Sequence, residues 1–260
     1  MSWLQGTILG LIQGITEILP ISSDGHLAVL QYIWHTPQSA RVNLTAALHL
    51  GTALAILFFL KGRLKEIVKG IFASDSSVRW NNIRLVILIV IASIPAIIVG
   101  IFFEDRVEMA FSNIFVIGIF FLVNGIFVFL SRVARKREEE IDLKKALLIG
   151  LIQTTAIMPA ISRSGTTIGL ALLLGLNRAQ AFDFSFLLAL PITFGAAVYE
   201  LPKVDFSVIA PESVVMGIIV AAFVGFIMMI LLKRLVLSRG FCWFGVYCWI
   251  VGLAVLIFLR

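Results

Sequence analysis

The chain has 260 residues, of which 60% are hydrophobic and 14% are charged, and its mean hydropathy is +1.05. A soluble domain of this length needs far more polar surface, so the composition excludes a soluble globular protein and indicates a membrane protein. In such a protein the net charge of +6 is typical of Lys and Arg in cytoplasmic loops, and we expect no nucleic-acid partner.

The first apolar region, Trp3–Trp34, is interrupted by a polar stretch at Pro20–His26. It has no basic leading segment, so we do not interpret it as a cleavable signal. The interruption predicts two short half-helices around a turn. Irregular backbone at membrane depth is tolerated only where it is buried in protein or lines a cavity. A second region, Leu143–Leu176, has the same pattern and is interrupted at Pro159–Gly165.

Six other segments are long and apolar enough to cross a bilayer as helices, and none alternates as a barrel strand does. We therefore predict an all-α polytopic membrane protein with six transmembrane helices and four re-entrant half-helices. Two cysteines in the last span, Cys242 and Cys248, have neither zinc nor disulfide spacing, so we expect them to pack. The six spans are Val42–Leu60, Ile83–Phe103, Phe111–Leu130, Ala179–Tyr199, Val214–Leu232 and Phe241–Leu259.

Charges between the spans predict the orientation. The loops 61–82, 131–145 and 233–240 carry fourteen Lys and Arg residues, whereas 104–110 and 200–212 carry two and are mostly acidic. Because basic loops stay inside, we place both termini and the acidic loops outside. The charged segment 132–142 is expected to be a solvated cytoplasmic linker.

The two sides of this linker repeat. Gly10–Gln13 returns as Gly150–Gln153 at an offset of 140, and at that offset Ser22 matches Ser162. Each half has three full crossings, and an odd number inverts the second half. We therefore predict inverted repeats over 1–131 and 143–260, whose polar turns meet near the middle of the membrane.

The first turn gathers groups capable of acid–base and metal chemistry. Gln13 and Glu17 share a helix face at i, i+4, and an ionisable residue inside a membrane segment is by default a functional candidate. The turn adds Ser23, Asp24 and His26. For a single serine or histidine, packing or a bond to its own backbone is the commoner role, but their joint occurrence favours a site.

The second turn suits a phosphate. Arg163 offers a planar fork for two phosphate oxygens, and the start of the following half-helix presents free amides and a positive dipole end. The candidate phosphate-binding residues are Ser162, Arg163, Ser164, Gly165, Thr166 and Thr167.

The stretches Gln13–Leu27 and Pro159–Thr167 resemble the two signatures of the bacterial undecaprenyl-diphosphate phosphatase family, the bacitracin-resistance phosphatases. Phe184–Pro191 is similar to this family as well. The resemblance implies a C55 polyprenyl diphosphate as substrate, the bacterial inner membrane as location, and a divalent cation, Mg²⁺ or alternatively Ca²⁺, as cofactor. It also implies interlocked inverted repeats, while a homodimer is left open.

By this resemblance, Glu17 belongs to an acidic pair that binds metal or activates the attack. Gln13 stands at the partner position, where many members have Glu, and Asp24 is a candidate replacement for that carboxylate. Ser23 matches a proposed nucleophile and His26 an essential histidine, and Ser162, Arg163 and Thr167 match the phosphate-binding set. The sequence also departs from the family at Ala160, usually Gly, and at Cys248, often Arg.

The function expected is hydrolysis of undecaprenyl diphosphate, which recycles the lipid carrier of cell-wall synthesis. The attack comes from Ser23 or from a metal-bound water, with His26 moving the proton. The alternative is a flippase or transporter of polyprenyl phosphate or another anion, since inverted repeats with broken helices also suit transport. The unrelated phosphatidic-acid-type phosphatases are set aside because no His follows Ser162–Arg163 in the chain.

Overall fold

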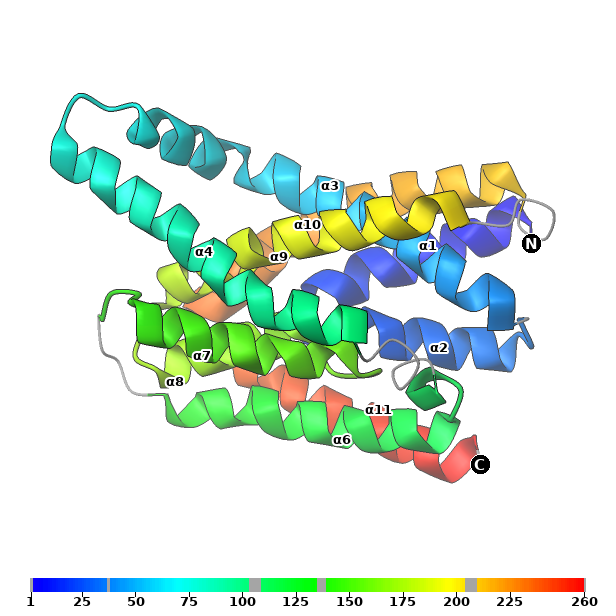
Figure 1. Ribbon diagram of the computed structural model, residues 1–260. Coiled ribbons are helices and arrows are strands. Elements are labelled where there is room, and N and C mark those ends of the chain that lie inside the picture. Colours follow the sequence, from blue (N-terminus) through cyan, green and yellow to red (C-terminus); the bar gives the residue numbers. More distant parts are fainter. Residues whose placement is uncertain (1, 37, 103–108, 135–138, 204–209, 260) are drawn as a thin grey trace.

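The computed structural model describes residues 2–36, 38–102, 109–134, 139–203 and 210–259 (Figure 1). Within these ranges the protein is helical, and the only β-structure is an isolated bridge between Glu139 and Leu176. Six helices of the described chain are long and apolar enough to cross a membrane. The predicted all-α polytopic membrane protein is therefore confirmed.

The candidate spans correspond to six helices. Short 3₁₀ segments flank three of them: η1 (Ser131–Val133) follows α6, η3 (Leu201–Lys203) follows α9, and η4 (Gly240–Cys242) precedes α11. Parts of the predicted outside loops, 104–108 and 204–209, lie outside the described residues, as do residues 135–138 of the linker. The six helices are α3 (Gln38–Ile71), α4 (Ser76–Phe102), α6 (Ile114–Leu130), α9 (Arg178–Glu200), α10 (Pro211–Leu237) and α11 (Trp243–Phe258).

The predicted loop 61–82 is wrong over most of its length. Helix α3 continues to Ile71 and α4 already begins at Ser76, so only a short turn separates them. The segment beyond Leu60 is rich in Lys, Arg, Leu and Glu, which are strong helix formers. Asp75 then starts α4, because its carboxylate accepts hydrogen bonds from the hydroxyl and the amide of Ser77. These bonds hold the pKa of Asp75 below its ordinary value.

Four shorter helices form the two broken regions. They are α1 (Trp3–Ile18), α2 (Ser23–Ile33), α7 (Leu143–Gln153) and α8 (Arg163–Leu173), and η2 (Thr154–Ile157) extends α7. The 16 residues of α1 span about 24 Å, less than the roughly 30 Å of a bilayer core. In Figure 1 the α1–α2 pair starts at the end of the molecule that holds both termini, and the α7–α8 pair starts at the opposite end.

Two of the half-helices, α1 and α7, pack closely against helices of the other half of the chain. Gly6 and Gly10 bring the backbone of α1 against Ser213 and Gly217 of α10, and Gly150 brings α7 against α4. Small residues allow this approach, and packing rather than the hydrophobic effect holds helices together in lipid. Helix α1 of the first half thus packs on α10 of the second half, and α7 of the second half packs on α4 of the first. This exchange supports the division into repeats 1–131 and 143–260, which itself stays a prediction.

The part of the linker that the structure describes is docked against the second half rather than fully solvated. The amide of Glu139 donates to the carbonyl of Gly175, and Arg84 donates to the carbonyl of Ile141. Asp142 caps α7 by accepting the amide of Lys145 at 2.8 Å, which keeps the pKa of Asp142 below its usual range. A bond to Glu139 in turn raises the pKa of Lys145.

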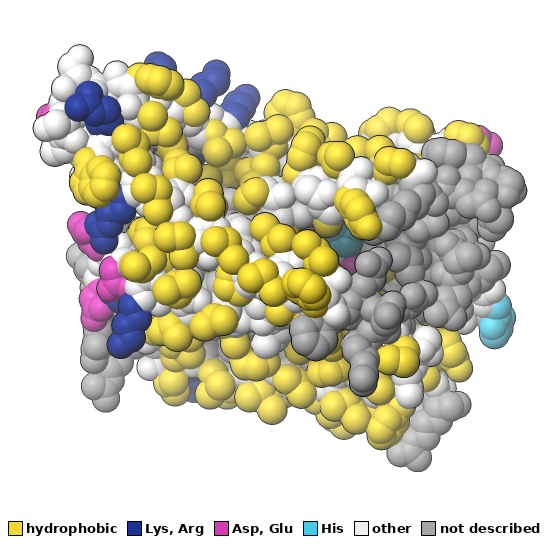
Figure 2. All heavy atoms as spheres, in the orientation of Figure 1, with side chains coloured by type: hydrophobic (Ala, Val, Ile, Leu, Met, Phe, Trp, Pro, Cys, Tyr) yellow, Lys and Arg dark blue, Asp and Glu magenta, His cyan; other side chains and the backbone are white. Residues whose placement is uncertain are grey.

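Basic side chains gather at one end of the described surface. Figure 2 shows hydrophobic side chains over most of the described part of the face in view, with Lys and Arg gathered toward the end opposite the termini. An apolar surface of this extent suits the hydrocarbon core of a bilayer.

Substituting Gly10 by Ala tests the close crossing of α1 and α10. A Cβ at Gly10 would overlap the backbone of Gly217, whereas a Cβ at Gly100 meets nothing within 4 Å. We expect Gly10→Ala to destabilise the protein by about 1–3 kcal/mol through overpacking. Gly100→Ala should be neutral or slightly stabilising, because alanine favours helix.

The measurement is the melting temperature of both variants in detergent. Equal melting temperatures for Gly10→Ala and the wild type would contradict this packing.

Candidate active site

Both turns are built in the same way. Helix α1 ends at Ile18, two residues before Pro20, and Ser22 caps α2 by accepting the amide of Gly25. In the second turn η2 ends before Pro159, and Ser162 caps α8 by accepting the amide of Gly165 at 3.1 Å. The predicted breaks are thus found, and Ser162 rather than Ser164 caps α8.

Each turn also contains one non-glycine residue with positive φ. Ser22 has φ of 67° and Ala160 has φ of 62°. Such conformations cost on the order of 1–3 kcal/mol and persist where the surroundings fix them, often at functional sites. Here the tips are fixed against each other, because a Cβ at Gly25 would collide with Ala160.

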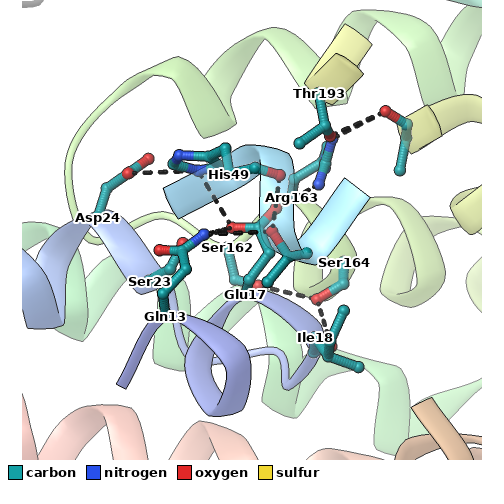
Figure 3. A network of polar contacts seen from close by, with 12 residues as sticks. Gln13, Glu17, Ile18, Ser23, Asp24, His49, Ser162, Arg163, Ser164 and Thr193 are labelled. Atoms are coloured by element: carbon teal, nitrogen blue, oxygen red, sulfur yellow. Dashed lines mark hydrogen bonds and ion pairs between the residues drawn. The ribbon is translucent and has the colours of Figure 1, made fainter. Parts of the chain in front are cut away.

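The two turns meet through an ion pair. Arg163 Nη2 lies 2.5 Å from Glu17 Oε1, and Ser164 Oγ donates to the carbonyl of Ile18 at 3.2 Å (Figure 3). Glu17 stands in the last turn of α1, and Arg163 is the first residue of α8. Residues 146 positions apart therefore share one site, as the repeat predicted.

Asn124, on the spanning helix α6, connects the two turns. Its Nδ2 donates to the carbonyl of Pro20 at 3.2 Å, and its Oδ1 accepts the amide of Ser162 at 2.9 Å. Asn124 is completely buried, and its Nδ2 also contacts the sulfur of Cys248 at 3.2 Å. One side chain on a spanning helix thus bonds to the backbone of both turns.

The first turn surrounds Glu17 with hydrogen-bond donors. Ser23 Oγ donates to Glu17 Oε2 at 2.5 Å, and Gln13 Nε2 lies 3.5 Å from the same oxygen. Gln13 also reaches Thr52 of α3 at 3.4 Å. The sequence predicted that Gln13, Glu17 and Ser23 lie together, and they do.

A histidine that the sequence analysis did not select stands at the centre of this cluster. His49 of α3 places Nε2 3.3 Å from Glu17 Oε2 and 3.6 Å from Asp24 Oδ1. Its other nitrogen, Nδ1, lies 2.8 Å from the carbonyl of Thr45. His49 therefore connects the carboxylates of α1 and α2.

Arg163 is held on two sides. Its Nη1 donates to the carbonyl of Ala189 at 3.2 Å and to the hydroxyl of Thr193, both on α9. Glu17 holds the other side of the same guanidinium. The group is thus oriented by neutral acceptors as well as by its ion pair.

His26 lies apart from the Glu17 cluster. Its Nδ1 is 2.7 Å from the carbonyl of Ser22, and its Nε2 is 2.9 Å from the hydroxyl of Tyr247 on α11. Phe121 packs edge-on against the ring. Because a carbonyl only accepts, Nδ1 carries the hydrogen and Nε2 is the basic nitrogen.

The hydroxyls of the predicted phosphate-binding set bond mainly within the protein. Thr166 and Thr167 donate to carbonyls one turn back, and Thr167 also lies 2.5 Å from Ser185 Oγ. Ser162 and Ser164 bond each other at 3.1 Å. Arg163 is the member of this set that faces the acidic cluster.

The site opens gradually from Glu17 outward. The exposed fraction of the side chain is 9% for Glu17, 16% for Arg163, 18% for His49 and 27% for Asp24. The two side chains of the ion pair are therefore mostly buried, and those of His49 and Asp24 lie nearer the surface.

The first turn offers the oxygen atoms that the expected divalent cation prefers as ligands. Mg²⁺ and Ca²⁺ prefer oxygen ligands, and Gln13 Oε1 is a buried oxygen without a hydrogen-bond partner beside Glu17. Asp24 would supply a second carboxylate. Within the described ranges no three His, Cys, Asp or Glu side chains form a metal-holding group, so Gln13, Glu17 and Asp24 remain candidate ligands only.

Comparison with known proteins identifies the family. The chain matches the family described as Bacitracin resistance protein BacA over residues 6–254. The chain belongs to this family. The family predicted from the two signatures is thereby confirmed.

Several relatives in this family carry the name undecaprenyl-diphosphatase. One from Methanococcus maripaludis strain C5 is 39% identical, covering 98% of this chain and 100% of the relative. One from Thermosipho africanus is 36% identical over 95% and 96% of the two chains. One from Bacteroides thetaiotaomicron is 36% identical over 99% of each.

Sequence reasoning missed Asn124, His49, Thr193 and Tyr247. The available signal was a polar or ionisable residue inside a long apolar span, which marks a functional candidate. That signal identifies Asn124 and His49. It does not identify Thr193 or Tyr247, because Thr bonds its own helix and Tyr is common near membrane interfaces.

Asn124→Leu tests the bond between the turns. The substitution leaves the amide of Ser162 buried without a partner, at about 1–3 kcal/mol, and leaves the carbonyl of Pro20 with only the thiol of Cys248 at 3.8 Å. We expect a melting temperature several degrees below that of the wild type in detergent. The control, Asn81→Leu, replaces an exposed asparagine near the start of α4 and should change little. A wild-type melting temperature for Asn124→Leu would show that the turns do not depend on this amide.

Proposed function

We propose that the protein hydrolyses undecaprenyl diphosphate to undecaprenyl phosphate and inorganic phosphate, and so recycles the lipid carrier of cell-wall synthesis. The names of the relatives support this substrate. The observation that carries the proposal is the contact of Arg163 with Glu17 between two turns within an apolar helix bundle. A phosphate-binding guanidinium at this depth suits a phosphate that arrives attached to a lipid.

Arg163 binds the diphosphate in this proposal. The incoming phosphate oxygens replace the Glu17 carboxylate on the guanidinium, while Ala189 and Thr193 keep the group oriented. The start of α8 adds the positive end of a helix dipole. Phosphoryl transfer needs mainly positioning and charge stabilisation, and both come from residues already in place.

Ser23 is placed to attack. Its hydroxyl donates to Glu17 Oε2 at 2.5 Å, so Glu17 can accept the proton as Ser23 Oγ bonds to the terminal phosphorus. The bond from that phosphorus to the bridging oxygen breaks and releases undecaprenyl phosphate. Water then hydrolyses the phosphoserine. The other route is direct attack by water on the terminal phosphorus, which needs no covalent intermediate.

His26 is the proposed proton carrier for the leaving oxygen and for the attacking water. Its Nε2 accepts a hydrogen bond from Tyr247, and its Nδ1 is fixed by the carbonyl of Ser22. This arrangement leaves Nε2 as the nitrogen that takes or gives a proton once a substrate oxygen replaces the tyrosine hydroxyl.

We also propose the bacterial inner membrane as the location, with both termini and the acidic loops outside. The basic end of the molecule lies opposite the termini, which supports this orientation (Figures 1 and 2). In that orientation the α1–α2 pair is re-entrant from outside and the α7–α8 pair from inside. A homodimer stays a prediction.

Arg163→Ala tests the proposed phosphate contact. Loss of the guanidinium should lower the rate of phosphate release from farnesyl diphosphate on the order of 10²–10³-fold. The control is Arg79→Ala, which removes an exposed arginine near the start of α4. Normal release by Arg163→Ala would show that the site assignment is wrong. If the wild-type protein releases no phosphate from C15 or C55 diphosphates, the transporter alternative is supported instead.

Ser23→Ala and His26→Ala together separate the two routes of attack. If Ser23 is the nucleophile, its loss should abolish turnover, and the loss of His26 should slow turnover about 10²–10⁴-fold. Near-normal turnover by Ser23→Ala excludes covalent catalysis by serine and leaves the water route.

The cation is a separate proposal. When bound, Mg²⁺ or Ca²⁺ would neutralise phosphate charge, with Gln13, Glu17 and Asp24 as ligands. The proposal predicts that a chelator stops phosphate release by the wild-type protein and that added cation restores it. Undiminished release in chelator contradicts it.

A further inference from the structure

His49 occupies a position that the proposed mechanism does not use. It lies on α3, outside both turns, yet its Nε2 points between Glu17 of α1 and Asp24 of α2 (Figure 3). An imidazole placed between two carboxylates in the interior of a membrane protein is unusual, because each such group is costly there.

The contacts of His49 define what it offers. Nδ1 lies 2.8 Å from the carbonyl of Thr45, and Nε2 lies at ion-pair distance from Glu17 and Asp24. Because a carbonyl only accepts, Nδ1 carries a hydrogen, and the form of the ring that pairs with the carboxylates is the imidazolium. The bond to Thr45 fixes the ring so that Nε2 points into the site.

Arg163 and His49 hold Glu17 from two sides. Arg163 contacts Oε1 at 2.5 Å and His49 contacts Oε2 at 3.3 Å. In this state two cationic side chains are balanced by two carboxylates, Glu17 and Asp24. A diphosphate that binds Arg163 brings further negative charge to the same point, and like charges placed side by side cost several kcal/mol unless cations are redistributed.

We propose that His49 is a second diphosphate-binding residue, which turns from Glu17 and Asp24 to the substrate when the diphosphate enters. This inference rests on the proposed function. The ligand class is a diphosphate with both phosphates within reach of the clamp formed by Arg163 and His49. The exposed fraction of the His49 side chain is 18%, close to the 16% of Arg163, so both side chains lie at a similar depth from the surface.

The test is the binding of inorganic pyrophosphate to the purified full-length protein in detergent, measured by calorimetry. His49→Gln removes a charge-assisted hydrogen bond, so its Kd should rise about 10–100-fold. His49→Lys retains a cation and should stay within about 3-fold of the wild type. His35→Asn, at an exposed histidine beyond α2, should bind as the wild type does. Wild-type affinity in His49→Gln overturns the inference.

Asp24→Asn provides an independent test if His49→Gln does not fold. The measurement is made with a chelator present, so that Asp24 acts through His49 and not as a cation ligand. Removing this carboxylate frees His49 and removes a like charge, so pyrophosphate should bind about 3–10-fold more tightly. A structural role of the Asp24–His49 contact predicts weaker binding instead, and that result overturns the inference.

Phosphate release from farnesyl diphosphate separates this inference from the proposed function. For His49→Gln we expect KM to rise more than kcat falls, because the lost contact is made to the bound substrate. Pyrophosphate binding that depends on His49, without any phosphate release by the wild type, refutes the proposed hydrolysis and supports the clamp. Normal release with binding that is independent of His49 refutes the clamp alone.

Discussion

The ion pair between Glu17 and Arg163 is the interaction on which the rest of the site depends. Each charge is costly in an apolar helix bundle, and removing one partner leaves the other unpaired. The pair therefore ties the two turns together in the absence of substrate. In the proposed function it also keeps the guanidinium where a phosphate can replace the carboxylate, so that one contact would serve both stability and binding.

The protein holds this pair with rigid supports rather than with loops. Asn124 bonds the backbone of both turns, and α9 orients Arg163 through Ala189 and Thr193. Positive φ at Ser22 and Ala160 lets each turn reverse within a few residues. Precise placement of charged groups is what phosphoryl transfer requires, and the strain at the turn tips is consistent with that requirement.

The two predicted repeats contribute different groups to the candidate site. Gln13 reaches Glu17 and Thr52, whereas its counterpart Gln153 is buried with neither of its polar side-chain atoms paired. At the position that corresponds to Glu17 the second half has Ile157. The first half thus supplies the carboxylates, and the second supplies the guanidinium at the position that corresponds to Ser23. One site results from two similar scaffolds.

Much of this architecture could be predicted from the sequence, because spans and breaks are local features. The lengths of the apolar segments predicted the six spanning helices, and the proline, serine and glycine residues predicted the turns near Pro20 and Pro159. The charged residues beyond Leu60 predicted a loop, yet α3 extends to Ile71, because Lys, Arg and Glu also favour helix. A polar residue within an apolar span marks His49 and Asn124 as candidates, but their partners could not be predicted, because contacts between distant helices depend on rotation about each helix axis, which the sequence pattern does not determine.

The most direct test of the account is an experimental structure with a non-hydrolysable polyprenyl diphosphonate bound in lipid. The account predicts that the diphosphonate lies between the two turns, with Arg163 contacting its oxygens, Ser23 beside the terminal phosphorus and the prenyl tail leading out into the bilayer. A diphosphonate bound elsewhere, with Arg163 still paired to Glu17, would contradict it.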